Sequence, residues 1–268
     1  MLKTLISLMA LVLVLGFASG ASADSLVAWF PFDDNAANAT VQEEVANKDA
    51  TFYSGAPTTE NTSLHHSADR VFGTGSLSFD GSNDNVITTP ADENYFDVGT
   101  GSFTVTFWIK TEDTDMHPLF KWQSSTQHYY FYGNPFRISI AGGGSSAQAT
   151  TAIGNVASGE WVHVACVRDR EYIDPETEEV APRLFLYVNG SVANSVADGT
   201  GNLDNTADLK IGTLMNGLMD DVGLYDYALT TSQVNFVKNN GVGTPIPEPG
   251  TMLLASLGVL VLFLRKRR

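Results

Sequence analysis

This 268-residue chain contains a single cysteine, Cys166. An internal disulfide framework is therefore excluded. Cys166 lies in the apolar run 161–167, whereas a catalytic thiol would need a histidine partner and a polar setting. We therefore predict a buried, unreactive thiol.

Basic residues are scarce as well. The chain has 15 Lys and Arg against 30 Asp and Glu, and Lys3 and residues 265–268 hold five of the basic ones. Residues 24–264 therefore carry ten basic and thirty acidic side chains, a net charge of −20. A surface of this sign repels nucleic acid and anionic membranes and attracts divalent cations, which argues against nucleic-acid binding.

The chain also lacks the patterns of common hydrolytic sites. Retaining glycosidases place two carboxylates about 5–5.5 Å apart, and a strand reading E-x-D-x-x-E, a familiar way to set such a pair, is absent. Residues 112–115 have the wrong spacing, residues 174–176 read as a loop, and no serine elbow or histidine cluster occurs. These absences predict a protein that is not an enzyme.

Residues 1–23 predict a secretory signal peptide. Lys3 precedes the apolar run 5–17, and the triplet Ala-Ser-Ala ends at Ala23, immediately before Asp24. This order is typical of signal peptides, with cleavage between Ala23 and Asp24. The apolar run is too short to remain as a membrane-spanning helix.

The C-terminal residues 250–268 predict a sorting helix. An apolar run is followed by four basic residues, which would stay cytoplasmic, and Pro247, Glu248 and Pro249 come directly before it. The order of Pro-Glu-Pro, one helix and a basic end resembles the PEP-CTERM sorting signal. That resemblance implies transient membrane anchorage, processing by an exosortase-type enzyme, and a Gram-negative exported protein linked with exopolysaccharide or biofilm. An ordinary tail anchor is the alternative.

Residues 24–241 predict one all-β domain, with 242–249 as a linker. Gly, Ser, Thr and Asn are common, and apolar residues alternate with polar ones, most strictly in 102–111. Residues 230–233 have the capping-box pattern of a single short helix that ends near Gly241.

Six segments of this domain resemble, in order, the motifs of laminin G-like domains of the concanavalin A-like class. The resemblance implies a two-sheet antiparallel jelly-roll sandwich. The segments are SLVAWFPF, GTGSLSFDGSNDNVITTP, SFTVTFWIKT, GEWVHVACVRD, RLFLYVNGSVAN and LKIGTLMNGLMDDVGLYDYAL.

The last of these segments, residues 209–229, predicts a hairpin linked near Asn216. On its returning strand, a two-residue period places Asp220 on the same face as Leu218 and Val222. A carboxylate among core positions is costly unless it is hydrogen-bonded or holds a cation.

Calcium takes six to eight oxygen ligands, and laminin G-like domains commonly carry a structural calcium ion. The resemblance therefore implies a possible structural Ca2+ at the matched acids Asp33, Asp80 and Asp220, with Asp84 and Asp221 as weaker candidates. Asp80 and Asp84 acting only as turn caps is the alternative.

Carbohydrate binding needs exposed aromatic rings beside hydrogen-bonding groups. In the predicted strand 128–132, alternate side chains face opposite sides, so one set packs in the core and the other faces outward. The alternative is that every ring packs inside the sandwich. The predicted ligand-binding residues are Tyr130, Tyr132, Trp122 and His128.

Together these features predict an exported, non-catalytic module that binds a glycan or another matrix component at the cell envelope or in the extracellular matrix. One rival is a structural matrix protein without a small-ligand site. Another is a divergent polysaccharide-active enzyme.

Overall fold

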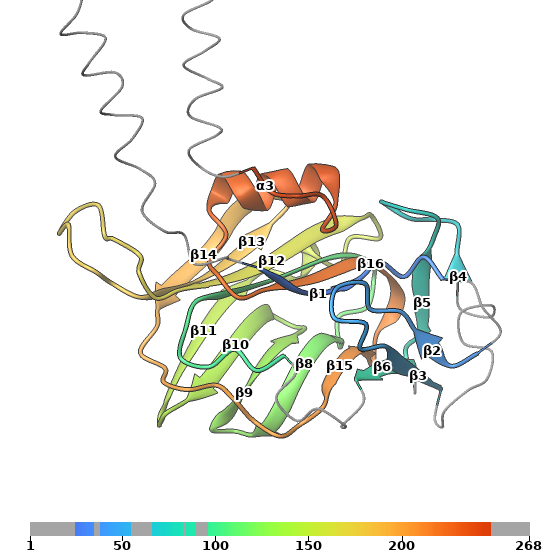
Figure 1. Ribbon diagram of the computed structural model, residues 1–268, viewed down its shortest axis with the longest axis horizontal. Coiled ribbons are helices and arrows are strands. Elements are labelled where there is room, and N and C mark those ends of the chain that lie inside the picture. Colours follow the sequence, from blue (N-terminus) through green and yellow to red (C-terminus); the bar gives the residue numbers. More distant parts are fainter. Residues whose placement is uncertain (1–24, 35–37, 55–65, 83, 89–95, 248–268) are drawn as a thin grey trace, which may run out of the picture. The chain divides into compact units, whose positions relative to one another are not determined.

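The computed structural model describes residues 25–34, 38–54, 66–82, 84–88 and 96–247 (Figure 1). Residues 25–244 form one compact unit, and the second unit comprises 1–24 and 245–268. Within the described residues, no helix is long and apolar enough to cross a membrane. Several predicted features lie outside the described residues: the signal peptide with Ala23 and Asp24, the C-terminal apolar segment, and Glu248 and Pro249.

The unit 25–244 is a sandwich of two antiparallel eight-stranded sheets, which confirms the predicted jelly-roll class. Sheet A runs in the order β14 (Ser191–Ala197), β13 (Arg183–Val188), β12 (Val162–Asp169), β7 (Phe103–Thr111), β16 (Asn216–Tyr225), β5 (Ser76–Asp80) and β4 (His66–Ser67), and β1 (Leu26–Phe30) also pairs with β16. Sheet B runs in the order β11 (Ser145–Thr151), β10 (Phe136–Gly142), β9 (Gln127–Tyr132), β8 (His117–Ser124), β15 (Leu209–Thr213), β6 (Asp84–Thr88), β3 (Ala50–Ser54) and β2 (Thr40–Val41).

The core lies between the two sheets and follows the alternation in the sequence. Phe107 of β7 and Phe131 of β9 are fully buried and meet edge to face, with ring centroids 5.0 Å apart. Each such ring contributes about 1.5–3 kcal/mol by leaving water. Cys166 of β12 is buried in the same core, and burial raises the pKa of its thiol, as predicted.

The predicted hairpin over residues 209–229 is wrong. β15 belongs to sheet B, where it pairs with β8 and β6, and β16 belongs to sheet A, where it pairs with β7 and β5. Residues 214–215 carry the chain from one sheet to the other, and Leu214 takes a positive φ of 55° to make this corner. A hairpin and a corner both join two alternating strands by a short turn, so the sequence does not separate them.

α3 (Thr231–Asn240) lies over sheet A on the side away from sheet B (Figure 1). Thr230 and Gln233 form the predicted capping box, in which each side chain bonds the other residue's backbone N–H. The Asn235 side chain donates to the Gly190 carbonyl at 2.9 Å, which ties the helix to the β13–β14 turn. Within the described residues, the other helical element is the 3-10 turn η1 (Ile153–Asn155).

The first and last strands of the domain are neighbours. β1 runs antiparallel to β16, with Leu26 opposite Tyr225. Just beyond this pair, the Ser25 backbone N–H donates to the Asp226 carboxylate at 2.7 Å, and the Asp226 N–H donates back to the Ser25 carbonyl. The entry and the exit of the sandwich are therefore joined side by side.

Candidate functional site

The outer face of sheet B carries a group of aromatic side chains. Because strand residues alternate, Tyr129 and Phe131 of β9 point into the core and are fully buried, while His128, Tyr130 and Tyr132 lie on the outer side of the sheet. There Tyr130 and Tyr132 are half-buried, and His128 is covered by its neighbours. The prediction of two opposite sets is confirmed, and the alternative that all these rings pack inside is wrong. We call the outward group the aromatic face; its members are His117, Phe120, Trp122, His128, Tyr130 and Tyr132.

The rings of the aromatic face touch one another in a continuous row. The ring centroids of Tyr130 lie 5.0 Å from those of Trp122 and 6.3 Å from those of Tyr132. Tyr132 continues to His117 at 4.9 Å, and His117 to Phe120 at 5.8 Å. Trp122 is 41% exposed, so the row keeps one end open to solvent.

The two histidines of this face are held as neutral rings. Burial lowers the pKa of both His117 and His128. His128 Nδ1 lies 2.9 Å from the Ser124 carbonyl, which makes Nδ1 the donor, and its Nε2 lies 3.2 Å from the Ser139 hydroxyl. At neutral pH both rings are therefore uncharged, and His128, which is 4% exposed and stacked under Trp122, supports its neighbours rather than contacting a ligand.

Two basic residues that the sequence analysis missed border the row. The Arg137 guanidinium lies over the Tyr132 ring, 4.5 Å from its centroid. The Lys210 ammonium lies 5.9 Å from the centroid of Phe120. Both distances fall within the range of cation–π attraction. The sequence feature that could have pointed to these two residues is that each occupies an outward-facing position on a strand of sheet B.

The loop 198–208, between β14 and β15, adjoins the Trp122 end of the aromatic face and is held there by hydrogen bonds. The Gln127 side chain donates to the carbonyls of Asn202 and Asp204, and the neighbouring Gln123 accepts from the Thr206 N–H. The same loop is anchored from inside by a fully buried ion pair, because the Arg168 Nε lies 2.8 Å from Asp198 Oδ2.

The Arg168 guanidinium also donates to four backbone carbonyls. It thereby joins the loop around Thr200 to the loop around Gly99. The acceptors are the carbonyls of Gly99, Gly101, Thr200 and Gly201.

Asp220 does not face the core, which corrects the predicted face. It lies opposite Trp108, whose strand sends Phe107 and Ile109 inward, so Asp220 shares the outer face of sheet A. The register shifts between Asp220 and Gly223, and Asp221 has a φ of 53°, as at a β-bulge. The extra residue reverses the alternation, so Met219 and Val222 both reach the core.

Both acids at this bulge are buried and bonded to backbone or indole N–H groups. Asp220 accepts from the Val71 and Phe72 N–H groups at 2.7 and 3.0 Å through Oδ2, while its Oδ1 is buried without a partner. Burial raises the pKa of Asp220 to about 7. Asp221 accepts from Trp29 Nε1 and the Val242 N–H, and burial raises its pKa to about 6.

The structure brings together only part of the predicted calcium site. The charge of Asp33 adds to the raised pKa of both Asp220 and Asp221, so these three acids lie within electrostatic range. Asp33 Oδ1 also accepts from the N–H groups of Thr74 and Gly75.

Asp80 and Asp84 lie elsewhere. Asp80 stands opposite Asn216, four residues before Asp220 on β16, so at about 3.3 Å per residue the two are about 13 Å apart along the sheet. Asp84 begins β6 in sheet B, opposite Ser54. A single ion bound by all five acids is therefore excluded.

A calcium cage is only partly in place. Among the described residues, no group of three or more His, Cys, Asp or Glu side chains is arranged to hold a metal ion. The unpartnered Asp220 Oδ1 fits a cation, but the bonded oxygens of its neighbours do not complete a shell. A bound calcium ion thus stays a prediction, and the predicted binding site is now limited to the surroundings of Asp220.

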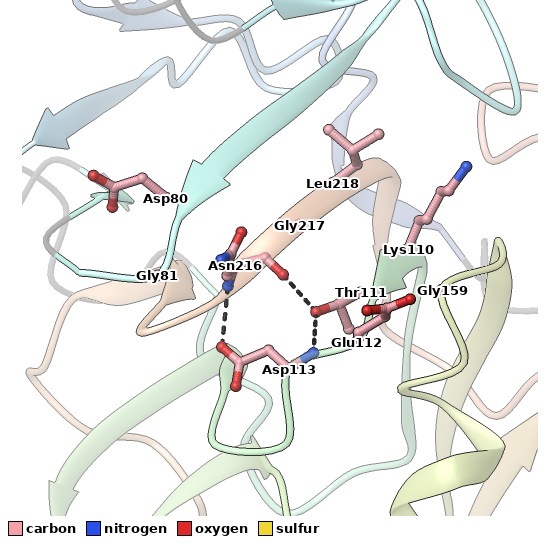
Figure 2. Close-up of a pocket in the computed structure, with 10 residues that line it drawn as sticks. All are labelled: Asp80, Gly81, Lys110, Thr111, Glu112, Asp113, Gly159, Asn216, Gly217 and Leu218. Carbon is pink, nitrogen blue, oxygen red and sulfur yellow. Dashed lines mark hydrogen bonds between the residues drawn. The ribbon is translucent and has the colours of Figure 1, made fainter.

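Asp80 instead helps to line a cavity of about 670 Å³ at the end of sheet A where β5, β7 and β16 meet (Figure 2). Among the described residues that line it, the other acids are Glu112 and Asp113, Lys110 is a cation, and none is aromatic. The Asp113 carboxylate accepts from the Asn216 N–H at 3.2 Å, and the Thr111 hydroxyl donates to the Asn216 carbonyl. These bonds hold the floor of the cavity.

Comparison with known proteins agrees with this architecture. Residues 79–235, more than half of the chain, match the concanavalin A-like lectin/glucanases superfamily, to which the chain therefore belongs. Residues 245–268 match the PEP-CTERM protein-sorting motif. No curated protein matches the chain.

Solved structures share the fold at low sequence identity. Domain 4 of AbnA, a GH43 extracellular arabinanase from Geobacillus stearothermophilus in complex with arabinotriose, has a TM-score of 0.55 and 18% identity over 80% of this chain and 98% of that one. The receptor-binding domain of botulinum neurotoxin D has a TM-score of 0.57 and 14% identity over 80% of this chain. The binding domain of Paraclostridial Mosquitocidal Protein 1 has a TM-score of 0.54 and 12% identity over 78% of this chain. The chain spans about half the length of the last two structures, at 52% of each.

Proposed function

We propose that this protein is an exported, non-catalytic module that binds carbohydrate through the aromatic face, sorted to the cell envelope or its matrix by an exosortase-type enzyme. The observation that carries the proposal is the continuous row of rings on the outer side of sheet B. Pyranose rings have apolar C–H faces, and partly exposed aromatic rings bind such surfaces while their polar edges hydrogen-bond hydroxyl groups.

The comparisons support this proposal without fixing the ligand. Most of the similar solved structures are binding domains, and one of them holds an arabinose trisaccharide. The sorting motif at residues 245–268 supports delivery to the envelope. The Tyr130 and Tyr132 hydroxyls and the Gln123 amide would supply the hydrogen bonds, and a structural calcium ion near Asp220 is a further expectation.

The test is a glycan array probed with the full-length chain in detergent micelles, once with calcium and once with EDTA. Saturable binding that falls in Tyr130→Ala and Tyr132→Ala would support the aromatic face as the site. Loss of binding in EDTA would show that binding needs a bound calcium ion, either at the site or as a support of the fold. Binding that persists in EDTA would leave the site intact and make the ion structural or absent.

Failure to bind any glycan in either buffer would contradict the proposal. The rival of a structural matrix protein, whose sandwich serves as a spacer or a protein-contact surface, would then be favoured.

The acid-lined cavity of Figure 2 is the observation that keeps an enzyme as a second candidate. Asp80 ends β5, whereas Glu112 and Asp113 directly follow β7, so the three acids escape a search for acids along one strand. Release of reducing ends from polysaccharide by the purified protein, abolished in Glu112→Gln, would establish that activity. Absence of turnover across the glycans that bind would favour the non-catalytic module.

A further inference from the structure

Arg137 and Lys210 differ from most other cations of this acidic domain in what they contact. In the part of the chain that the structure describes, neither has a carboxylate within salt-bridge distance, and each lies over an aromatic ring instead. The Arg137 Nε is also buried without a hydrogen-bond partner. The basic residues that do pair with aspartates are Lys110, Lys121, Arg168, Arg170 and Arg183.

The two cations border the aromatic face on opposite sides. Lys210 of β15 stands opposite Phe120 of β8, and Phe120 stands opposite Tyr130 of β9. On the other side, Arg137 of β10 stands opposite Tyr132. Three strand spacings of about 4.8 Å separate β15 from β10, so the strands that carry the two residues lie about 14 Å apart across the sheet, with rings between them.

This placement matters because the rest of the domain repels anions. Residues 24–264 carry a net charge of −20. The two histidines of the aromatic face stay neutral, so Arg137 and Lys210 supply its positive charge. Aromatic contacts hold both cations without neutralising them, and an unneutralised guanidinium can form a bidentate pair with a carboxylate.

We infer that the ligand of the aromatic face is an acidic polysaccharide, with sugar rings on Tyr130, Tyr132 and Trp122 and uronate carboxylates paired with Arg137 and Lys210. This inference rests on the proposed carbohydrate-binding function. A sugar chain laid across β8 and β9 meets apolar ring faces in the middle and a cation at either side. A neutral polymer would use the rings alone and leave both cations unpaired.

The experiment compares polygalacturonate, alginate and hyaluronan with the same polymers after chemical reduction of their carboxyl groups. Binding of the full-length chain in detergent is measured by affinity electrophoresis in EDTA, so that calcium cannot bridge polymer and protein acids. The variants are Arg137→Gln/Lys210→Gln and the charge-retaining Arg137→Lys. Lys238→Gln on α3 is the matched control, because it removes one cation away from sheet B.

The inference predicts that at least one acidic polymer binds at least about 10-fold more tightly than its reduced form. Raising NaCl from about 50 mM to about 500 mM should weaken that binding, because salt screens the exposed pairs. The double variant should lose the preference for the acidic form, whereas Arg137→Lys and Lys238→Gln should retain it.

Two other outcomes separate the inference from the proposed function. Equal binding of acidic and reduced polymers, lost in Trp122→Ala, would overturn the acidic ligand and keep the carbohydrate module. Failure of all six polymers to bind would overturn both.

Discussion

The indole of Trp122 stacks on the imidazole of His128, with ring centroids 4.3 Å apart and planes inclined by 14°. These residues are cross-strand partners on β8 and β9. His128 is itself fixed by Ser124 and Ser139, so the indole rests on a rigid support while remaining 41% exposed. A ring that is already ordered loses little entropy when a sugar binds to it.

Trp122→Ala should therefore weaken glycan binding by about 10-fold or more, or about 1.4 kcal/mol, because exposed aromatic anchors carry a large share of binding energy. The melting temperature of the Trp122→Ala variant should change little, since the Trp122 side chain lies outside the core. Isothermal titration and thermal melts measure the two effects. Trp161→Ala, which removes a partly exposed indole beside sheet A, is the control and should bind normally.

Calcium, if bound near Asp220, should raise the melting temperature relative to EDTA. A cation would pair with the buried Oδ1 of Asp220 and offset the free-energy cost of burying this carboxylate, which is seen in its pKa of about 7. Binding to the folded state alone stabilises that state. Asp220→Asn should abolish the calcium effect, and Asp80→Asn should leave it intact, because Asp80 lies elsewhere on the sheet. Identical melts in calcium and EDTA would contradict the prediction.

His163 should make the domain less stable in acid. Burial lowers the pKa of this histidine to about 3, its Nε2 lies 2.6 Å from the Thr106 hydroxyl, and its Nδ1 is buried without a partner. The unfolded chain, with a pKa of about 6.5, binds the proton first, so stability is lost as the pH falls from about 6.5 toward 3.

His163→Gln keeps a polar group beside Thr106 but does not titrate. The stability of the wild type minus that of this variant should rise by a few kcal/mol between about pH 4 and 7 and then level off. The difference isolates His163, because the raised pKa values of Asp220 and Asp221 give the opposite slope in both proteins. Urea unfolding across this range is the measurement, and a flat difference would refute it.

Asp198→Asn should destabilise the domain by about 3–5 kcal/mol, because it leaves the buried Arg168 guanidinium without a carboxylate partner. Arg168→Met should destabilise it less, because the partly exposed Arg170 still pairs with Asp198 at 3.1 Å. The double variant should cost less than the sum of the two. Denaturant unfolding of the four proteins completes the cycle. If the effects simply add, the pair is not coupled as its 2.8 Å contact implies.

The alternation of apolar and polar residues predicted an all-β domain and two opposite sets of rings, because it decides which side chains face the core. The sandwich itself was implied by the resemblance to laminin G-like domains. It failed where the outcome depends on a partner strand. The turn between Gly212 and Asn216 reads as a hairpin but joins two sheets, and one extra residue at the Asp221 bulge reversed the predicted face of Asp220. Arg137 and Lys210 were missed because only the lateral register of sheet B places them beside the rings.

The pairing of β1 with β16 has a mechanical consequence. A force that pulls residues 25 and 226 apart breaks the hydrogen bonds between β1 and β16 one after another, starting at the Ser25–Asp226 pair. In this unzipping geometry β1 should detach at low force. A force applied between a polymer bound to sheet B and the C-terminal end of the domain does not pull on the β1–β16 pair. The domain should accordingly hold tension between its aromatic face and its C-terminal end better than tension between its two ends.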